Sequence, residues 1–164
     1  MDNILADLSY CCGCEACAQV CPAKAISLRP DKYGFLYPEI NQVLCVDCEM
    51  CKRVCPALHN EVEHISPLLY SAYSNDEHKR NSGSSGGVFG LLAEKVLSEG
   101  GYVYGAAFDS NLKLRHIEVS DINDLPPILK SKYIQSDIGN SFLSVRKRLK
   151  RGNRVLFCGT PCQC

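Results

Sequence analysis

The stretch Cys11-Cys-Gly-Cys-Glu-Ala-Cys-Ala-Gln-Val-Cys-Pro-Ala23 recurs in pattern as Cys45-Val-Asp-Cys-Glu-Met-Cys-Lys-Arg-Val-Cys-Pro-Ala57, 34 residues further along the chain. Both copies follow C-x-x-C-x-x-C-x-x-x-C-P, and they share a glutamate, a valine and an alanine at matching positions. Similarity at a fixed offset indicates one supersecondary unit that is used twice. Between the copies, short apolar segments at 25–28 and 34–37 flank a turn that contains Pro30, which predicts a β-hairpin.

Cysteine is the unusual residue of this chain, with 12 in 164 residues and nine of them within the first 60. The 18 basic and 18 acidic residues cancel, so there is no electrostatic case for a nucleic acid partner. The N-terminus lacks the pattern of a secretory signal, and no run approaches the roughly 18 apolar residues of a membrane span. We therefore expect a cytoplasmic protein with no membrane span. In that reducing compartment, bunched thiols favour metal ligands over disulfides.

The rest of the chain predicts a second domain. Residues 61–67 are polar and end at a proline, so we expect a linker between a first domain, 1–60, and a second, 68–164. The predicted elements are a strand at 69–73, a loop at 81–87, a helix at 88–99, strands at 102–108 and 112–119, a short helical turn or loop at 121–128, a helix at 138–150 and a strand at 155–157. This order indicates an α/β fold. Because the sequence stops just after that last strand, we expect it to hold only the N-terminal part of the α/β domain.

The cysteine spacing points to iron-sulfur chemistry. Three cysteines at i, i+3 and i+6 can wrap one side of a cubane cluster, and a fourth ligand must then come from elsewhere. The alternatives are a pair of zinc sites or a disulfide knot. Zinc typically takes C-x-x-C pairs separated by a dozen or more residues, and a third cysteine only three residues on fits a tetrahedral site poorly. A 60-residue domain also lacks a large apolar core, so clusters would complete its interior.

Residues 5–60 resemble the bacterial two-cluster ferredoxins, an α+β fold in which the fourth cysteine of each run serves the other cluster. The resemblance implies two [4Fe-4S] clusters. One set of ligands would be Cys11, Cys14, Cys17 and Cys55, and the other would be Cys45, Cys48, Cys51 and Cys21. Cys12 matches Val46 in the second copy, so we assign it no ligand role and expect a spare thiol near a cluster. Two clusters in so small a domain would relay single electrons.

In the second domain, residue patterns alone leave alternatives open. Ser84-Ser-Gly-Gly87 at a helix start is either an anion-binding turn or an ordinary serine N-cap after a flexible loop. The basic face from Arg146 to Arg151 either meets an anionic group or is solvated. The four histidines, which include His116, lack ligand spacing, and we expect them on the surface.

Three motifs in order make residues 70–164 similar to the N-terminal part of the coenzyme F-420 hydrogenase and dehydrogenase beta-subunit family. They are Ser85-Gly-Gly-Val-Phe89, Ser131-Lys-Tyr-Ile-Gln-Ser136 and Val155-Leu-Phe-Cys-Gly-Thr-Pro-Cys-Gln163. The resemblance implies FAD, with Ser85, Gly86, Gly87, Lys132 and Gln135 near the flavin and Cys162 near an additional cluster completed by residues beyond this chain. Gly90 departs from the family, which often has a hydroxyl residue there, and Cys158 and Cys164 complete no cluster by their spacing.

Two hypotheses for function follow. The first is an iron-sulfur flavoprotein oxidoreductase, or its electron-transfer subunit, that passes electrons between [4Fe-4S] clusters, FAD and a hydride-carrying coenzyme or small molecule; deazaflavin and a nicotinamide are both open. The alternative is a ferredoxin-like carrier whose second domain only docks a partner enzyme, because residues 61–164 give a weak signal for any catalytic base or nucleophile. Residues 1–60 carry five basic and seven acidic residues, a balance that suits a basic partner surface.

Overall fold

The computed structural model describes residues 8–59 and 68–164, and the chain divides into two compact units. The first unit comprises residues 1–64 together with 161–163, and the second comprises residues 65–160 and Cys164. The expected linker at 61–67 lies outside the described residues. Among the residues that are described, no helix combines the length and the apolar character needed to cross a membrane.

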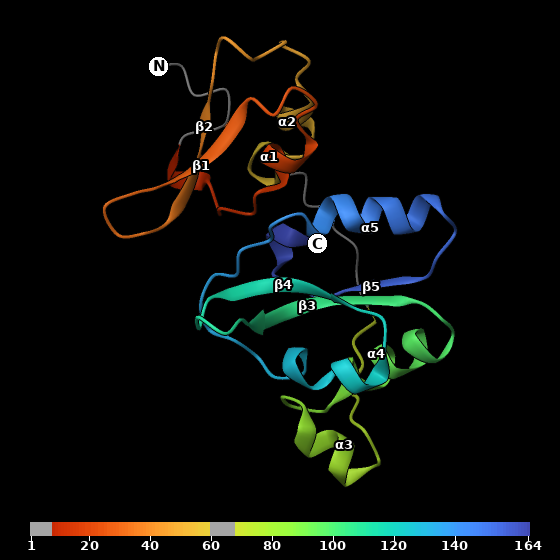
Figure 1. The fold of residues 1–164 in the computed structure, drawn as a ribbon. Helices are drawn as coiled ribbons and strands as arrows, with labels where there is room; N and C mark the ends of the chain where they lie inside the picture. The colour runs from red at the N-terminus through yellow and green to blue at the C-terminus, as the bar shows by residue number, and fades with distance from the viewer. Residues whose placement is uncertain (1–7, 60–67) are drawn as a thin grey trace. The chain divides into compact units, whose positions relative to one another are not determined.

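The first unit is built on a hairpin and two short helices (Figure 1). Its elements are a 3-10 turn Leu8–Tyr10, α1 Ala16–Val20, β1 Ile26–Pro30, β2 Leu36–Ile40, α2 Met50–Arg53 and a 3-10 turn Pro56–Leu58. The predicted hairpin is confirmed, since β1 pairs with β2 in antiparallel register. The carboxylate of Asp31 holds its turn by accepting hydrogen bonds from the backbone N–H groups of Tyr33 and Phe35 at 2.8 and 2.9 Å. Gly34, with φ of +90°, supplies the left-handed residue of that turn.

The two sequence copies have the same backbone conformation at matching positions. Gly13 and Asp47 occupy matching positions with φ of 63° and 49°, and Glu15 and Glu49 do so with φ of 65° and 57°. Each glutamate then begins a helix, because its carbonyl accepts hydrogen bonds from the N–H groups three and four residues later. Only the first copy has glycine at one of these left-handed positions. The second copy uses Asp47 there, a residue type that tolerates this conformation better than most.

Proline ends each copy. The residue before a proline is pushed out of the helical region by the proline ring. Cys21 and Cys55 accordingly have extended backbones, with φ and ψ of −66° and 113° and of −80° and 112°. The C-P pair therefore separates the fourth cysteine of each copy from the helix that carries the third.

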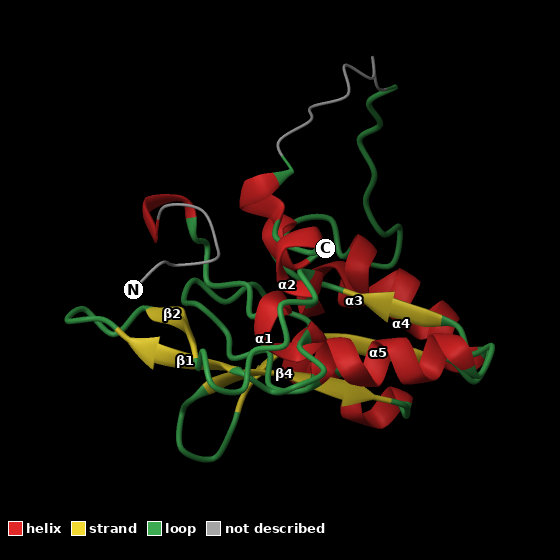
Figure 2. Ribbon diagram, turned by 90° about the horizontal axis from the view of Figure 1, so that it is seen from above, coloured by secondary structure: helices red, strands yellow, loops and turns green. Residues whose placement is uncertain are grey.

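The second unit is a three-stranded sheet with helices on both faces, in which α5 lies on one side and α4 on the other (Figures 1 and 2). Its elements are α3 Glu77–Ser82, α4 Val88–Ser98, β3 Tyr102–Phe108, β4 Leu114–Val119, 3-10 turns Ile122–Asp124 and Pro126–Ile128, α5 Ser141–Lys150 and β5 Val155–Phe157. The 3-10 turn Pro161–Gln163 that follows β5 in the chain belongs to the first unit. The strand order is β4-β3-β5, with β3 antiparallel to β4 and parallel to β5. The predicted mixture of helices and strands is confirmed.

The main core lies between α4 and the sheet. Its buried side chains are Ala93, Leu97, Val103, Ala107, Val119, Leu125 and Ile128. Leu91 and Leu92 of α4 lie outside this core and are 37% and 52% exposed. The apolar stripe of α4 that packs on this core is formed by the buried Ala93 and Leu97 and the partly buried Phe89 and Val96, which lie at helical spacing.

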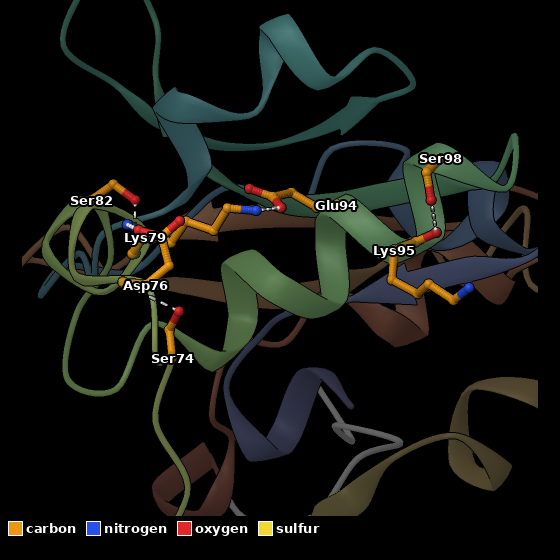
Figure 3. A network of polar contacts seen from close by, with 7 residues as sticks. All are labelled: Ser74, Asp76, Lys79, Ser82, Glu94, Lys95 and Ser98. Carbon is orange, nitrogen blue, oxygen red and sulfur yellow. Dashed lines mark hydrogen bonds and ion pairs between the residues drawn. The ribbon is translucent and has the colours of Figure 1, made fainter.

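The region before α4 differs from its prediction. Leu69–Tyr73 is not a strand: Leu69 and Tyr70 are 89% and 85% exposed, and the segment has no strand partner among the described residues. Residues 81 and 82, expected in a loop, belong to α3. That helix begins because Asp76 accepts a hydrogen bond from the Lys79 N–H, and it is tied to α4 by a 2.5 Å ion pair between Lys79 and Glu94 (Figure 3).

Candidate functional site

A first cavity in the N-terminal unit is lined by thiols from both sequence copies. Cys11, Cys14 and Cys17 come from the first copy, and Cys55 reaches it from the second. Cys12, Leu28, Pro38, Pro56 and Ala57 also form its wall. Cys17 is buried, and burial raises the pKa of its thiol to about 12 and also raises the pKa of Cys14. Iron binding there must displace protons from these thiols.

A second cavity is related to the first by the repeat. Cys45, Cys48 and Cys51 come from the second copy, and Cys21 reaches the cavity from the first. Ala25, Ile26, Ile40 and Val46 supply apolar wall, and Asp47, Glu49 and Lys52 supply charged side chains. The backbone N–H of Ala25 donates to Cys21 Sγ at 3.3 Å, and the Cys45 thiol donates to Asp47 Oδ1 at 3.6 Å. Burial raises the pKa of Cys51.

The structure thus gathers the eight cysteines into the two sets that the ferredoxin resemblance implies. The thiols line the cavity walls rather than converge on one point. Within residues 8–59 and 68–164, no three cysteine, histidine, aspartate or glutamate side chains are close enough to hold a single metal ion.

One face of the hairpin forms a wall of both cavities. The cross-strand pair Leu28 and Pro38 lines the first cavity, and the pair Ile26 and Ile40 lines the second. These pairs are two residues apart on each strand, so they share a face. The step between them along the strands is about 7 Å at the usual rise per residue. The two cavities are therefore neighbours along a single apolar strip.

Two further cysteines accompany the first cavity. Cys12, expected to be a spare thiol, lines it and hydrogen-bonds with Cys14 and Cys162. Burial, followed by the hydrogen bond with Cys162, raises the pKa of Cys12 to about 12. Cys162 lies in the 3-10 turn Pro161–Gln163, which belongs to the first unit by its contacts.

In the second unit, hydrogen bonds link the second and third family-like motifs through His116, and the residue just before the first motif bonds to the second. Ser84 Oγ, just before the first motif, accepts from the backbone N–H of Ser131 at 2.9 Å. Ser136, at the end of the second motif, contacts His116 Nδ1 at 2.8 Å, and His116 Nε2 contacts the carbonyl of Cys158 in the third motif at 3.0 Å. Cys158 and Cys164 are exposed as whole residues. Partial desolvation of the Cys158 sulfur, followed by the nearby Cys164 thiol, raises the pKa of Cys158.

His116 corrects an expectation, because it is 8% exposed and not a surface residue. Burial lowers the pKa of its imidazole. The signal was present in the sequence: in an alternating strand, His116 shares a face with Leu114, which is also buried. The link through His116 between the second and third motifs could not be read from spacing, since its partners lie 20 and 42 residues away.

The five residues expected near a flavin lie in two segments of the second unit. Ser85, Gly86 and Gly87 form the turn before α4, and Lys132 and Gln135 lie in the loop before α5. Lys132 Nζ donates to the carbonyl of Pro127 at 2.7 Å, and burial lowers its pKa. Gln135 is exposed.

The chain's own backbone accounts for both glycines of this turn. A Cβ at Gly86 would lie 2.6 Å from the carbonyl oxygen of Ala72, and a Cβ at Gly87 would lie 2.9 Å from the Cα of Arg80. Gly87 also has φ of +73°. Close packing of the neighbouring segments therefore requires glycine here, with or without a ligand.

Comparison with known proteins bears on the first unit. Residues 10–58 match the family model of the 4Fe-4S dicluster domain. A search of the curated proteins found no match to the chain. The first unit thus contains a ferredoxin-like iron-sulfur domain, with the redox role that such a domain suggests.

Proposed function

We propose that residues 8–59 form a one-electron relay that holds two [4Fe-4S] clusters, with four cysteine ligands in each cavity. The observation that carries this proposal is the exchange of cysteines: Cys55 completes the set of the first copy, and Cys21 completes the set of the second. The donor chemistry fits, since four thiolates are the usual ligands of a cubane cluster.

The surrounding residues suit the same role. Each cluster, when bound, would accept and release one electron at a time. Leu28, Pro38, Pro56 and Ala57 would keep water from the first set of thiols, and Ile26 and Ile40 would shield the second. The hairpin face that these residues share would hold the two sets side by side, which favours rapid electron transfer between them.

The test is anaerobic purification followed by quantitation of iron, sulfide and zinc, with an electron paramagnetic resonance spectrum of the dithionite-reduced protein. We expect about eight irons and eight sulfides per chain and a spectrum of two interacting clusters. Zinc at stoichiometric level, or iron without sulfide, would exclude the proposal.

For the second unit we propose a flavin-linked role, in which hydride from a deazaflavin or nicotinamide coenzyme would be converted to single electrons. This finer proposal is supported by the family-like motifs and by the bonds that join them, from Ser84 to Ser131 and from Ser136 through His116 to Cys158. Stoichiometric FAD in the same preparation, and reduction of the clusters by NADH or reduced deazaflavin, are the expected results.

A carrier without flavin is the second candidate. It is favoured by the packing of Gly86 and Gly87 against the chain's own backbone, which leaves these glycines explained without a ligand. A preparation with eight irons and no flavin, inert to NADH and reduced deazaflavin but reducible by dithionite, would decide for the carrier. Dye reduction by either coenzyme without an added reductase would decide against it.

A further inference from the structure

Helix α5 carries a basic face that neither the relay nor the flavin-linked role uses. The face consists of residues that share one side of the helix, because they are spaced at i, i+3, i+4, i+7 and i+8: Leu143, Arg146, Lys147, Lys150 and Arg151. All five are exposed. Within the part of the chain that the structure describes, none of the four cations takes part in an ion pair.

The opposite side of α5 is held against the sheet (Figure 1). Arg148 binds both carboxylate oxygens of Glu118 on β4, at 2.6 and 3.2 Å, and Ser144 donates to the same carboxylate at 2.7 Å. The guanidinium of Arg148 also lies 3.8 Å from the ring centroid of Tyr102. The backbone positions of the basic face are therefore fixed relative to the sheet.

The charge of this face has no counterpart in its own segment. Residues 138–164 hold six basic residues and no acidic one, although the whole chain is neutral. Two of the six are neutralised by acidic residues from elsewhere in the second unit. Arg148 pairs with Glu118, and Arg154 pairs with Glu99. The other four are the cations of the basic face, which leaves a surplus of positive charge there.

Helix stability accounts for only part of this arrangement. The helix dipole favours cations in the last turn, which explains Lys147 and Lys150, but Arg146 precedes that turn. Arg146 and Lys150 are four positions apart, as are Lys147 and Arg151, and like charges at that spacing destabilise a helix. Such a surplus on exposed side chains becomes favourable when an anionic surface neutralises it.

The composition of the face indicates a protein as the partner. Leu143 is 45% exposed and lies one turn before Arg146 and Lys147, so an apolar contact adjoins the charges. Arginine beside an apolar side chain is typical of protein interfaces, whereas a helix that lies on a membrane needs a wide apolar face. From Leu143 to Arg151 the face spans about 12 Å at the usual helical rise. A single acidic helix or loop of a partner is long enough to cover it.

We propose that the basic face of α5 is the docking surface for an acidic protein whose carboxylates surround an apolar side chain. Arg146, Lys147, Lys150 and Arg151 would bind the carboxylates, and Leu143 would pack against the apolar side chain. The proposal goes beyond the relay function, because it concerns residues of the second unit and requires neither clusters nor FAD.

The test uses the full chain, purified anaerobically, with two fluorescently labelled acidic peptides as probes. One peptide alternates leucines with groups of glutamates, and the other has serine in place of every leucine, so their charges are equal. The variant Arg146→Gln/Lys150→Gln removes two charges from the face and retains good helix formers. The matched control, Lys113→Gln/Lys130→Gln, removes two exposed charges of the second unit outside α5. Fluorescence anisotropy gives the dissociation constants, and circular dichroism checks that each variant is folded.

We expect the dissociation constant of the leucine peptide to rise at least about five-fold in the α5 variant and less than about two-fold in the control. Binding should also weaken as the ionic strength is raised. In the unaltered chain the leucine peptide should bind more tightly than the serine peptide. Leu143→Ser should remove that difference, because it deletes the apolar contact and leaves the charges in place.

Four outcomes would overturn the docking proposal. The first is an unchanged dissociation constant in the folded α5 variant, and the second is equal binding of the two peptides by the unaltered chain. The third is tighter binding of phosphatidylserine vesicles or duplex DNA that the same variant abolishes, which would assign the face to a membrane or a nucleic acid. The fourth is self-association of the unaltered chain in sedimentation velocity that the variant abolishes, because the face would then bind a second copy. Iron and sulfide contents of the same samples test the relay function separately.

Discussion

The imidazole of His116 stacks on the ring of Phe157, with the ring centroids 5.2 Å apart and the planes 9° from parallel. The stack joins a side chain of β4 to a side chain of β5 although β3 lies between these strands in the sheet, and both ring nitrogens of His116 reach polar partners, Ser136 Oγ and the carbonyl of Cys158. A buried histidine with both nitrogens engaged holds two loops in place at once.

Replacing His116 with phenylalanine should retain the stack and lose both hydrogen bonds. The Ser136 hydroxyl is buried and would lose its partner, so we expect a loss of about 1–3 kcal/mol in the free energy of unfolding. Urea unfolding followed by circular dichroism measures this loss. The double variant His116→Phe/Ser136→Ala should cost less than the sum of the single variants, and strict additivity would contradict the pairing.

The acid stability of the second unit should depend on Glu118. A two-point hydrogen bond with Arg148, at 2.6 and 3.2 Å, lowers the pKa of Glu118 from 4.5 to about 2. The folded state then keeps this carboxylate ionised where the unfolded state protonates it. Its stabilisation is therefore complete above pH 4.5 and is lost as the pH falls toward 2.

Glu118→Gln should consequently lower stability at pH 7 by roughly 1 kcal/mol, a modest figure because the side chain is 26% exposed. The variant should also flatten the decline between pH 4.5 and 2, as measured by thermal unfolding across that range. Glu99→Gln provides a control, because Glu99 is also paired with basic residues but lies outside this network. An unchanged acid profile in Glu118→Gln would show that other carboxylates govern acid unfolding.

Gly86 and Gly90, which pack against different segments of the chain, should respond oppositely to replacement by alanine. At Gly86 the added Cβ meets backbone atoms of Ala72 and Tyr73 at 2.6 and 3.1 Å, so the chain must shift, at a cost of about 1–3 kcal/mol. At Gly90 the nearest atom is a methyl group of Leu129 at 3.4 Å, and alanine raises helix propensity by up to about 1 kcal/mol. Thermal unfolding of both variants is the measurement, and equal shifts would contradict the packing described for the turn.

The exchange of cysteines between copies can be tested by iron counting. If Cys55 completes the first set, Cys11→Ala/Cys55→Ala removes ligands from one cluster only, and about four irons should remain. Cys11→Ala/Cys21→Ala then damages both clusters, and little iron should remain. If each copy held its own cluster, the two results would be reversed. Cys12→Ala is the control and should retain about eight irons.

The elements predicted best were those with a local signal. The hairpin, α4, β3 and β5 follow from apolar periodicity and from turn residues a few positions away, and the structure places them close to the expected bounds. Helix α3 was missed because its residues are polar on all sides, although Asp76 followed by Glu77 is an N-terminal signal. The strand at 69–73 was wrong because an apolar run becomes a strand only when another strand edge is available to it.

The features that could not be predicted from the sequence depend on contacts between residues far apart in the chain. The gathering of eight cysteines into two sets was anticipated only through the ferredoxin resemblance, since spacing alone left the fourth member of each set open. Gly13 and Glu15 are buried, whereas the matching residues of the second copy are exposed. This contrast was invisible, because the two motifs are nearly the same and burial depends on what packs around them. The contact of Ser136 with His116 likewise depends on how the loop before α5 returns to β4.

The position of Cys55 in the wall of the first cavity also has a consequence for how the protein is made. A ribosome delivers Cys11, Cys14 and Cys17 early, but the wall they belong to includes Cys55, Pro56 and Ala57. Cys21, which also lines the second cavity, has already been synthesised when Cys45, Cys48 and Cys51 leave the ribosome. The last cysteines of the two cavities, Cys51 and Cys55, are therefore synthesised within a few residues of each other. Clusters would be inserted into a chain in which both cysteine sets are complete or both are incomplete.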